Sequence, residues 1–233
     1  MKKTNFLLIV LWASSLFALN AQTPSSYTIA NKFPIEGEGK WDYVTMEETS
    51  GRLFVSHETV VNVIDVRTGD LLGTIPDTKG VHGIALARDV DKGYITCARN
   101  DSSVTVFDLT TLKTIRKIKN SGKKPDAILY DGFSKKIFVF NAGSNCVSVV
   151  DPNTDVIIAT ILLESNPEFS VSDKNGKIYV NLEDKSRLAV INSITLKVEN
   201  SWSLAPGEGP TGLALDNETH RLFSVCEIGR AHV

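Results

Sequence analysis

Residues 136–140 read Lys-Ile-Phe-Val-Phe, and residues 149–151 read Val-Val-Asp. Segments similar to the first recur along the chain, each with one aromatic residue, and segments similar to the second follow them. The aromatic residues lie 40, 44, 41 and 44 residues apart, at Phe54, Tyr94, Phe138, Tyr179 and Phe223. A constant period of this length predicts a repeat architecture.

Each repeat reads as four short strands separated by turn residues. The strands expected in the second repeat are residues 83–87, 93–98, 103–108 and 113–119. Val104 and Val106 alternate with Thr105 and Phe107, which is the two-residue period of a β-strand. The aspartates that end the third strands, Asp65, Asp108 and Asp151, are expected to accept backbone N–H groups in turns rather than to catalyse a reaction.

Four strands every ~42 residues, with no helical periodicity, predict an all-β chain built from the four-stranded antiparallel blades of a β-propeller. Residues 22–226 are long enough for about four blades and part of a fifth. We expect residues 27–35 to form an outermost strand. Residues 211–226 should supply only two inner strands of the fifth blade, without a third strand. The sequence therefore predicts an incomplete propeller.

The third repeat points to a family. Residues 138–151, Phe-Val-Phe-Asn-Ala-Gly-Ser-Asn-Cys-Val-Ser-Val-Val-Asp, closely resemble the YVTN β-propeller repeat, whose consensus is Tyr-Val-Thr-Asn-x-Gly-Ser-Asn-Thr-Val-Ser-Val-Ile-Asp. The fourth repeat departs from it, with Asn-Leu-Glu-Asp-Lys-Ser at residues 181–186. The resemblance implies an extracytoplasmic propeller of the YncE-like kind, which typically has seven blades.

Both ends of the chain have features of their own. Lys2 and Lys3 precede an apolar run over residues 6–17, and small Ala21 offers a cleavage site. We predict a signal peptide over residues 1–21 and a secreted or periplasmic protein without a membrane span after cleavage. A retained anchor helix is the alternative, but the run is shorter than the ~20 residues that a bilayer requires. Residues 227–233, Glu-Ile-Gly-Arg-Ala-His-Val, match the translation of a common sequencing adapter, so the natural sequence is expected to continue differently after Cys226.

Composition excludes several classes of protein. The chain has 233 residues, of which 42% are hydrophobic, and 25 basic against 27 acidic residues give a net charge of −2. Such a chain is neither disordered nor collagen-like nor a coiled coil, and it has no global positive field for nucleic acid or anionic lipid. Three cysteines are too few for a disulfide-dense scaffold.

One set of polar residues occupies equivalent places in the repeats. The first polar position of each innermost strand is Asp42, His82, Asp126, Glu168 or Thr211. In a propeller these side chains surround one mouth of the central channel, where carboxylates and an imidazole could bind a divalent cation. The alternative is a hydrated polar lining without a ligand. His57 and Arg99 are expected near the same face. No residue is predicted to be catalytic.

The expected function follows from this mouth. We predict a non-catalytic scaffold that binds a small molecule or a protein at the channel face, without a predicted cofactor, although a divalent metal is left open. An enzyme at the mouth, such as a metal-assisted lactonase-like hydrolase, and the propeller domain of a redox protein are the alternatives. The basic residues within 113–124 could bind nucleic acid. Lysines on an exposed strand edge that block edge-to-edge pairing are the favoured interpretation.

Overall fold

The computed structural model describes residues 27–99, 102–228 and 230–232, with only the backbone of residues 228 and 230–232. It divides into two units, residues 1–34 and residues 35–233. The predicted signal peptide therefore lies outside the described residues. No described helix has the length and apolar character needed to cross a membrane.

The described residues of the second unit form four four-stranded sheets and one three-stranded sheet. The first sheet contains β1 (Trp41–Glu47), β2 (Arg52–His57), β3 (Val60–Asp65) and β4 (Leu71–Ile75). The second contains β5 (Val81–Ala87), β6 (Lys92–Cys97), β7 (Ser103–Asp108) and β8 (Thr114–Lys119). The third contains β9 (Pro125–Asp131), β10 (Lys136–Asn141), β11 (Cys146–Asp151) and β12 (Val156–Leu162).

The fourth sheet contains β13 (Pro167–Ser172), β14 (Lys177–Leu182), β15 (Arg187–Asn192) and β16 (Lys197–Ser203). The fifth contains β17 (Glu208–Asp216), β18 (Arg221–Ile228) and β19 (Arg230–His232). Three single turns of 3-10 helix, η1 (Arg88–Val90), η2 (Ala142–Ser144) and η3 (Glu183–Lys185), lie in the connections. All pairings are antiparallel between strands adjacent in the chain, so the predicted four-stranded repeat is confirmed.

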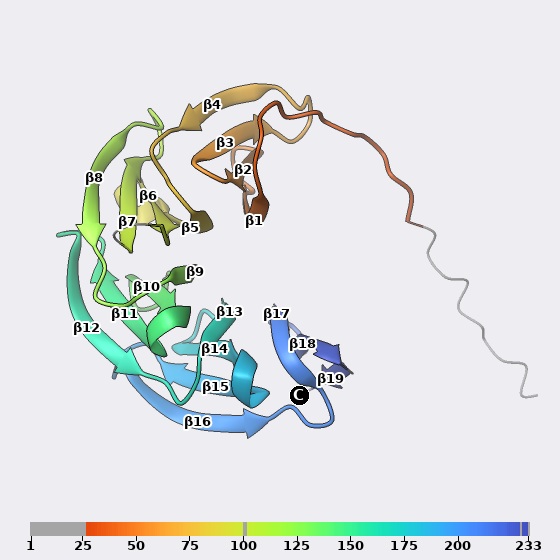
Figure 1. Cartoon of the computed structure of the whole chain (residues 1–233), viewed down its shortest axis with the longest axis vertical. Helices are drawn as coiled ribbons and strands as arrows, with labels where there is room; N and C mark the ends of the chain where they lie inside the picture. Colours follow the sequence, from red (N-terminus) through yellow and green to blue (C-terminus); the bar gives the residue numbers. More distant parts are fainter. Residues whose placement is uncertain (1–26, 100–101, 229, 233) are drawn as a thin grey trace, which may run out of the picture. The chain divides into compact units, whose positions relative to one another are not determined.

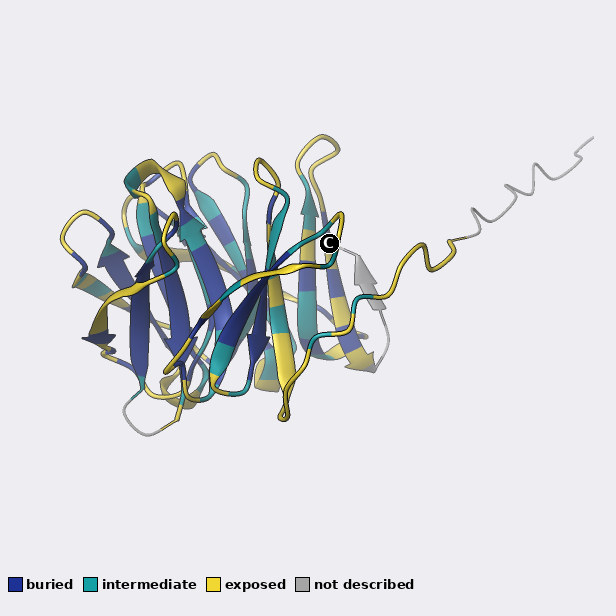
Figure 2. Cartoon of the chain, turned by 90° about the horizontal axis from the view of Figure 1, so that it is seen from above, coloured by how far each residue is buried: buried dark blue, intermediate teal, exposed yellow. Residues whose placement is uncertain are grey.

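The sheets fan out around a common axis, with β1, β5, β9, β13 and β17 innermost (Figure 1). Each innermost strand contacts the innermost strand of the next sheet. Figure 2 shows buried residues in the middle of the strands and exposed residues in the loops at both faces. The strands thus place the residues at their two ends on opposite faces of the array.

Apolar clusters between successive sheets form the core. Phe54 of β2 and Phe107 of β7 are fully buried, with ring centroids 5.8 Å apart. Phe138 of β10 and Ile178 of β14 belong to the cluster between the third and fourth sheets. Since the sheets bury their faces mainly by stacking on one another, contact between neighbours provides most of the hydrophobic stabilisation.

The outward faces of the first and fifth sheets carry exposed apolar side chains. Val44 and Met46 of β1 are 61% and 43% exposed, and Val225 of β18 is 59% exposed. The aromatic residues of the repeat show the same trend, because Phe54 and Phe138 are fully buried whereas Phe223 is 39% exposed. Apolar burial is therefore greatest between the sheets and weaker on these two faces.

Of two expectations about the outer segments, one was wrong and one agrees with the structure. Residues 27–35 form no strand, and Tyr27 and Ile29 are highly exposed. A strand requires a partner for its backbone groups, and no strand is paired with these residues in the described structure. Residues 211–226 contribute to two strands, β17 and β18, as expected, and the third strand of the fifth sheet, β19, comes from residues 230–232. Backbone pairing with an open strand edge requires no particular side chains, so this segment, which was set aside as adapter-encoded, can pair there.

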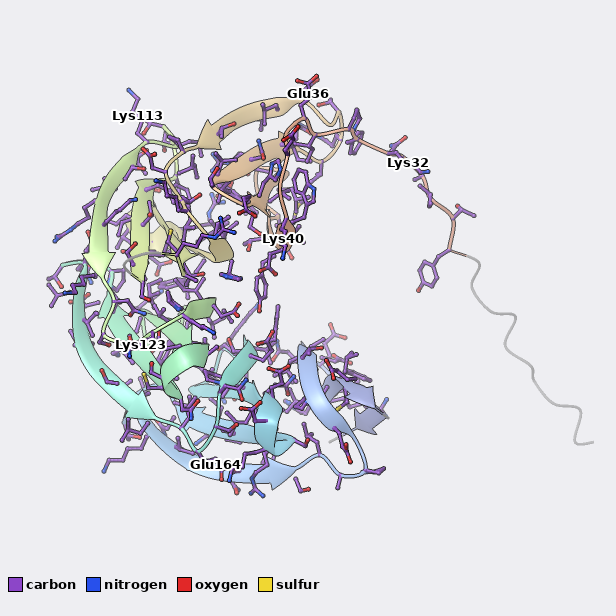
Figure 3. All side chains as sticks on the ribbon, in the orientation of Figure 1. Lys32, Glu36, Lys40, Lys113, Lys123 and Glu164 are labelled. Atoms are coloured by element: carbon purple, nitrogen blue, oxygen red, sulfur yellow. The ribbon has the colours of Figure 1, made fainter. Side chains whose placement is uncertain are left out.

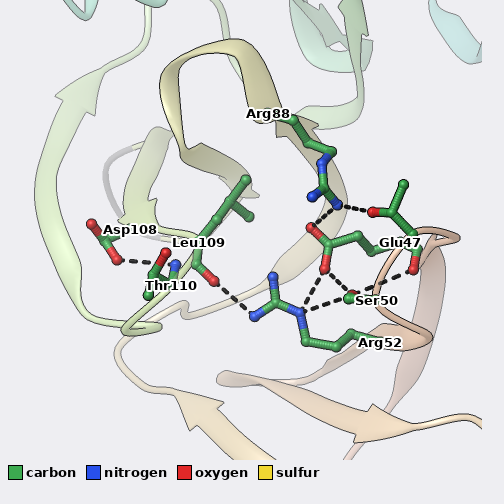
Figure 4. A network of polar contacts seen from close by, with 8 residues as sticks. Glu47, Ser50, Arg52, Arg88, Asp108, Leu109 and Thr110 are labelled. Atoms are coloured by element: carbon green, nitrogen blue, oxygen red, sulfur yellow. Dashed lines mark hydrogen bonds and ion pairs between the residues drawn. The ribbon is translucent and has the colours of Figure 1, made fainter.

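Polar contacts join neighbouring sheets at the face where the innermost strands end. Glu47 of β1 accepts hydrogen bonds from Arg52 at 2.6 Å and from Ser50, and its second oxygen lies 2.8 Å from Arg88 of the second sheet (Figure 4). Lys92 contacts Asp155 of the third sheet, and Ser172 of the fourth sheet donates to Asp131 of the third. A buried carboxylate therefore contributes to each of these three interfaces at this face.

The turns after the third strands and the basic residues within 113–124 have the positions that the sequence predicted. Asp65, Asp108 and Asp151 accept backbone N–H groups from the turns that follow them. The strand β8 is outermost in its sheet and exposed except at Ile118, which supports the edge interpretation of the basic run. In Figure 3, Lys113 lies at the periphery, whereas Lys40 lies beside the central space.

Candidate functional site

The predicted mouth residues share one local backbone feature. Every innermost strand has a break in register near its start, where two residues of the strand bulge away from the ladder. The bulge residues of the five sheets are Asp42–Tyr43, His82–Gly83, Asp126–Ala127, Glu168–Phe169 and Thr211–Gly212. A bulge redirects side chains and increases the local twist. The repeated bulge therefore gives the five predicted residues an equivalent setting in each sheet.

Gly83 sets the distance between the second and third sheets. A Cβ atom at this position would lie 2.9 Å from the carbonyl oxygen of Asp126, so only glycine permits this approach. The buried Thr96 hydroxyl donates to the same carbonyl at 2.6 Å and accepts from Gly83 N at 2.8 Å. These contacts fix the backbone of His82 beside that of Asp126.

Asp42, His82 and Asp126 converge from three successive sheets. The Nδ1 atom of His82 lies 2.5 Å from Oδ2 of Asp42 and 3.6 Å from Oδ1 of Asp126. One potential ligand atom from each residue lies within 4.8 Å of the other two. The three side chains are 22–40% exposed, so a solute can reach them. We call these three residues the mouth triad.

The mouth has an excess of negative charge. The hydrogen bond with Asp42 raises the pKa of His82, together with the charges of Asp126 and Glu168 and against the effect of burial. Burial raises the pKa of Asp126, and the nearby His82 opposes this shift. Burial and the charges of Asp126, Glu183 and Asp42 raise the pKa of Glu168 to about 7. The carboxylates thus crowd around one imidazole, an arrangement that attracts cations.

Tyr43 and Glu183 belong to this environment, although the sequence analysis did not select them. Burial raises the pKa of Tyr43, with further contributions from Asp126, Glu168 and a hydrogen bond with Asp126. The Tyr43 ring stacks on Phe169 of β13, with ring centroids 5.5 Å apart. Glu183 comes from η3 and accepts from Asn166 at 2.9 Å. For Tyr43, the only sequence signal was its position next to Asp42, and Glu183 had none.

The other predicted mouth residues lie apart from the triad. Thr211 occupies the bulge of the fifth sheet, where its carbonyl accepts from the buried Asn181 at 3.1 Å. His57 is 4% exposed, stacks on Trp41 at 3.8 Å and contacts Asn62. Arg99 forms an ion pair with Glu58 at 2.5 Å. Of the seven predicted residues, the structure brings three into contact and places Glu168 within their electrostatic reach.

Replacing Glu168 with glutamine tests the charge crowding. The folded pKa of Glu168, about 7, lies above the ~4.3 of an unfolded chain, so folding favours the protonated form. Wild-type stability should therefore fall as the pH rises from about 4.5 to 7, whereas E168Q lacks this loss. With chelator present, we expect a higher melting temperature for E168Q at pH 8 and equal values at pH 4.5. Equal melting temperatures of wild type and E168Q at both pH values would contradict the crowding of negative charge around Glu168.

Comparison with solved structures identifies the architecture. The chain is similar to Kuenenia stuttgartiensis hydrazine synthase, with a TM-score of 0.72 and 19% sequence identity, covering 85% of this chain and 58% of that chain. It is also similar to the β-propeller domain of Cps50 (Swd1) from Myceliophteria thermophila, with a TM-score of 0.69 and 15% identity. The fold is a β-propeller.

At these identities the similarity concerns the fold alone. The chain spans 58% and 65% of the two matched chains, and 85% of its own length is covered in each comparison. No family model matches the sequence, and no curated protein is significantly similar to it. The comparisons therefore show the propeller fold and assign no specific function.

Proposed function

We propose that this propeller is an exported binding module of the YVTN type and that its mouth triad binds a divalent cation as part of the ligand site. The likeness of residues 138–151 to the YVTN consensus supports the family. The basic start and apolar run of residues 1–21 support export. The observation that carries the proposal is the convergence of Asp42, His82 and Asp126 from three sheets.

The donor set favours particular ions. Imidazole nitrogen with carboxylate oxygens suits Zn²⁺ or Mn²⁺, whereas Ca²⁺ prefers six to eight oxygen ligands. Donors around one Zn²⁺ lie about 2.0–2.2 Å from the ion, hence at most ~4.4 Å from one another. The triad atoms lie within 4.8 Å of one another, so small rotations of these partly exposed side chains suffice. The ion would leave coordination positions open toward solvent for a ligand.

Titration calorimetry with Zn²⁺ and Mn²⁺ tests the proposal. We expect saturable 1:1 binding that weakens at least tenfold in Asp126→Asn and His82→Ala, because each variant removes one ligand. Glu48→Gln is the matched control, since it removes one negative charge from an exposed residue at the opposite end of the first sheet. Equal affinity in wild type, D126N and H82A would refute the triad as the cation site.

A hydrolase at the mouth is the second candidate. Glu168 is the next carboxylate around the mouth and lies within electrostatic reach of Asp126, where it could act as a general base toward a metal-bound water. The same preparations distinguish the two functions. Hydrolysis of simple lactones by the Zn²⁺-loaded chain, lost in E168Q with Zn²⁺ affinity retained, would favour the enzyme over the binding module.

A further inference from the structure

A cavity of about 700 Å³ lies at the opposite end of the innermost strands from the mouth triad. Its wall comes from the ends of β9, β13 and β17 and from the turns that follow these three strands. Leu129 lies three residues beyond Asp126 on the same strand, a distance of about 10 Å. The volume falls within the roughly 300–1,000 Å³ of small-molecule sites. The cavity is thus a separate candidate site.

Apolar side chains dominate the wall of this far-end cavity. Leu129, Val171 and Leu215 come from three successive sheets, and Phe133 extends from the turn after β9. Phe133 is 50% exposed, although aromatic rings usually bury their area. An apolar ligand against these four side chains would remove this surface from water.

One polar atom in the wall has no partner. Ser170 of β13 is 6% exposed, and its hydroxyl forms no hydrogen bond with any described residue. The neighbouring Ser172, in contrast, donates to Asp131 at 2.7 Å and accepts from the backbone of Lys174. A buried hydroxyl without a partner costs free energy, which a ligand can recover by forming the missing bond once the Ser170 side chain rotates its hydroxyl toward the cavity.

The charges around the cavity do not favour an ionic ligand. Lys174 is the only charged residue among the described wall residues, and acidic Asp173 precedes it in the chain. Asp131, whose pKa is lowered by hydrogen bonds from Ser172 and Ser134 that outweigh its burial, lies directly behind Ser172. Positive and negative charges therefore offset each other near the rim, and a neutral ligand suits the site best.

From these observations we propose that the far-end cavity binds a neutral aromatic molecule with one hydroxyl group, whose ring contacts Phe133 and Leu129 and whose hydroxyl pairs with Ser170. Ring burial supplies most of the affinity, and the Ser170 hydrogen bond supplies the preference for a phenol over a plain hydrocarbon. The site shares no residue with the mouth triad, so it is independent of the proposed cation binding.

The test titrates p-cresol and toluene into the whole chain and measures the binding of each probe by ligand-observed NMR. We expect saturable binding of p-cresol, tighter than that of toluene. Ser170→Ala should weaken p-cresol about 3- to 10-fold and leave toluene unchanged. This variant should fold normally, because it removes a hydroxyl that makes no hydrogen bond with the described residues.

A second variant blocks the cavity without disturbing the fold. Gly132 lines the cavity, and a Cβ atom there would meet nothing within 4 Å, so Gly132→Leu should fill the space and abolish binding of both probes. Asp126→Asn should leave p-cresol affinity unchanged, which separates this site from the mouth. The proposal is overturned if neither probe binds saturably, if G132L binds as wild type does, or if S170A does not distinguish the two probes.

Discussion

Asp155→Ala is expected to lower the free energy of unfolding by about 3–5 kcal/mol, the range typical of a buried ion pair that loses one partner. The Lys92 ammonium lies 3.0 Å from Oδ1 and 2.9 Å from Oδ2 of Asp155, and Tyr94 donates to Oδ1 at 2.7 Å. The side chains of Asp155 and Lys92 are only 7% and 20% exposed. Loss of the Asp155 carboxylate would leave the Lys92 ammonium and the Tyr94 hydroxyl without the partner they share, inside the interface of the second and third sheets.

Urea unfolding of wild type, D155A and Asp155→Asn measures this contribution. Asp155 has a φ of 56°, a conformation that asparagine tolerates better than alanine. D155N thus retains the backbone conformation and a hydrogen-bond acceptor for Tyr94 while it removes the charge, and its loss should be intermediate. A loss below about 1 kcal/mol in D155A would show that the contact does not hold the interface.

The second large effect is expected for Glu47→Ala, at about 2–3 kcal/mol at pH 7. Its carboxylate is 2% exposed and pairs with Arg52 of its own sheet and with Arg88 across the first interface. Because Arg88 is half exposed, solvent screens its attraction to Glu47. The expected loss of stability is therefore smaller than that for a fully buried ion pair. Arg88→Ala, which removes only the exposed partner, should cost less than E47A.

The pH dependence of this effect has a defined sign. Burial tends to raise the pKa of Glu47, but the hydrogen bonds from Arg52 and Ser50 and the charges of Arg52 and Arg88 outweigh it and lower the pKa. The stabilisation is therefore complete above the unfolded pKa of ~4.3 and is lost as the pH falls through the lower folded pKa. The difference between wild type and E47A should shrink between pH 5 and pH 3. A constant difference over this range would contradict the contribution of the ionised carboxylate.

Most of the fold could be predicted because the same pattern of strands and turns repeats along the sequence at a nearly constant spacing. The strands of the second repeat appear within two residues of their expected bounds, since alternating side chains and turn residues mark them directly. The segment 27–35 misled because its composition resembles that of an outer strand, whereas a strand also requires a partner. The pairing of β19 involves residues 230–232, which lie in the segment set aside in the sequence analysis, and it depends on the backbone alone.

The candidate sites were predictable only in part. Asp42, His82 and Asp126 were found because they occupy equivalent positions, but their contact depends on a backbone bulge and on the missing Cβ of Gly83. His57 also matched a repeat position, yet it lies buried against Trp41. The far-end cavity had no sequence signal, because its walls meet only when three sheets pack together.

The order of the strands within each sheet has a consequence for folding. Every sheet pairs its strands in the order in which they occur in the chain, so each hairpin closes over a short connection. Short loops keep the entropy of closure low, and a sheet can form once its own ~42 residues are available. Nucleation can therefore begin at more than one repeat and spread by docking of neighbours. A defect such as D155A should slow docking of the second and third sheets while the hairpins of the fourth form at their usual rate.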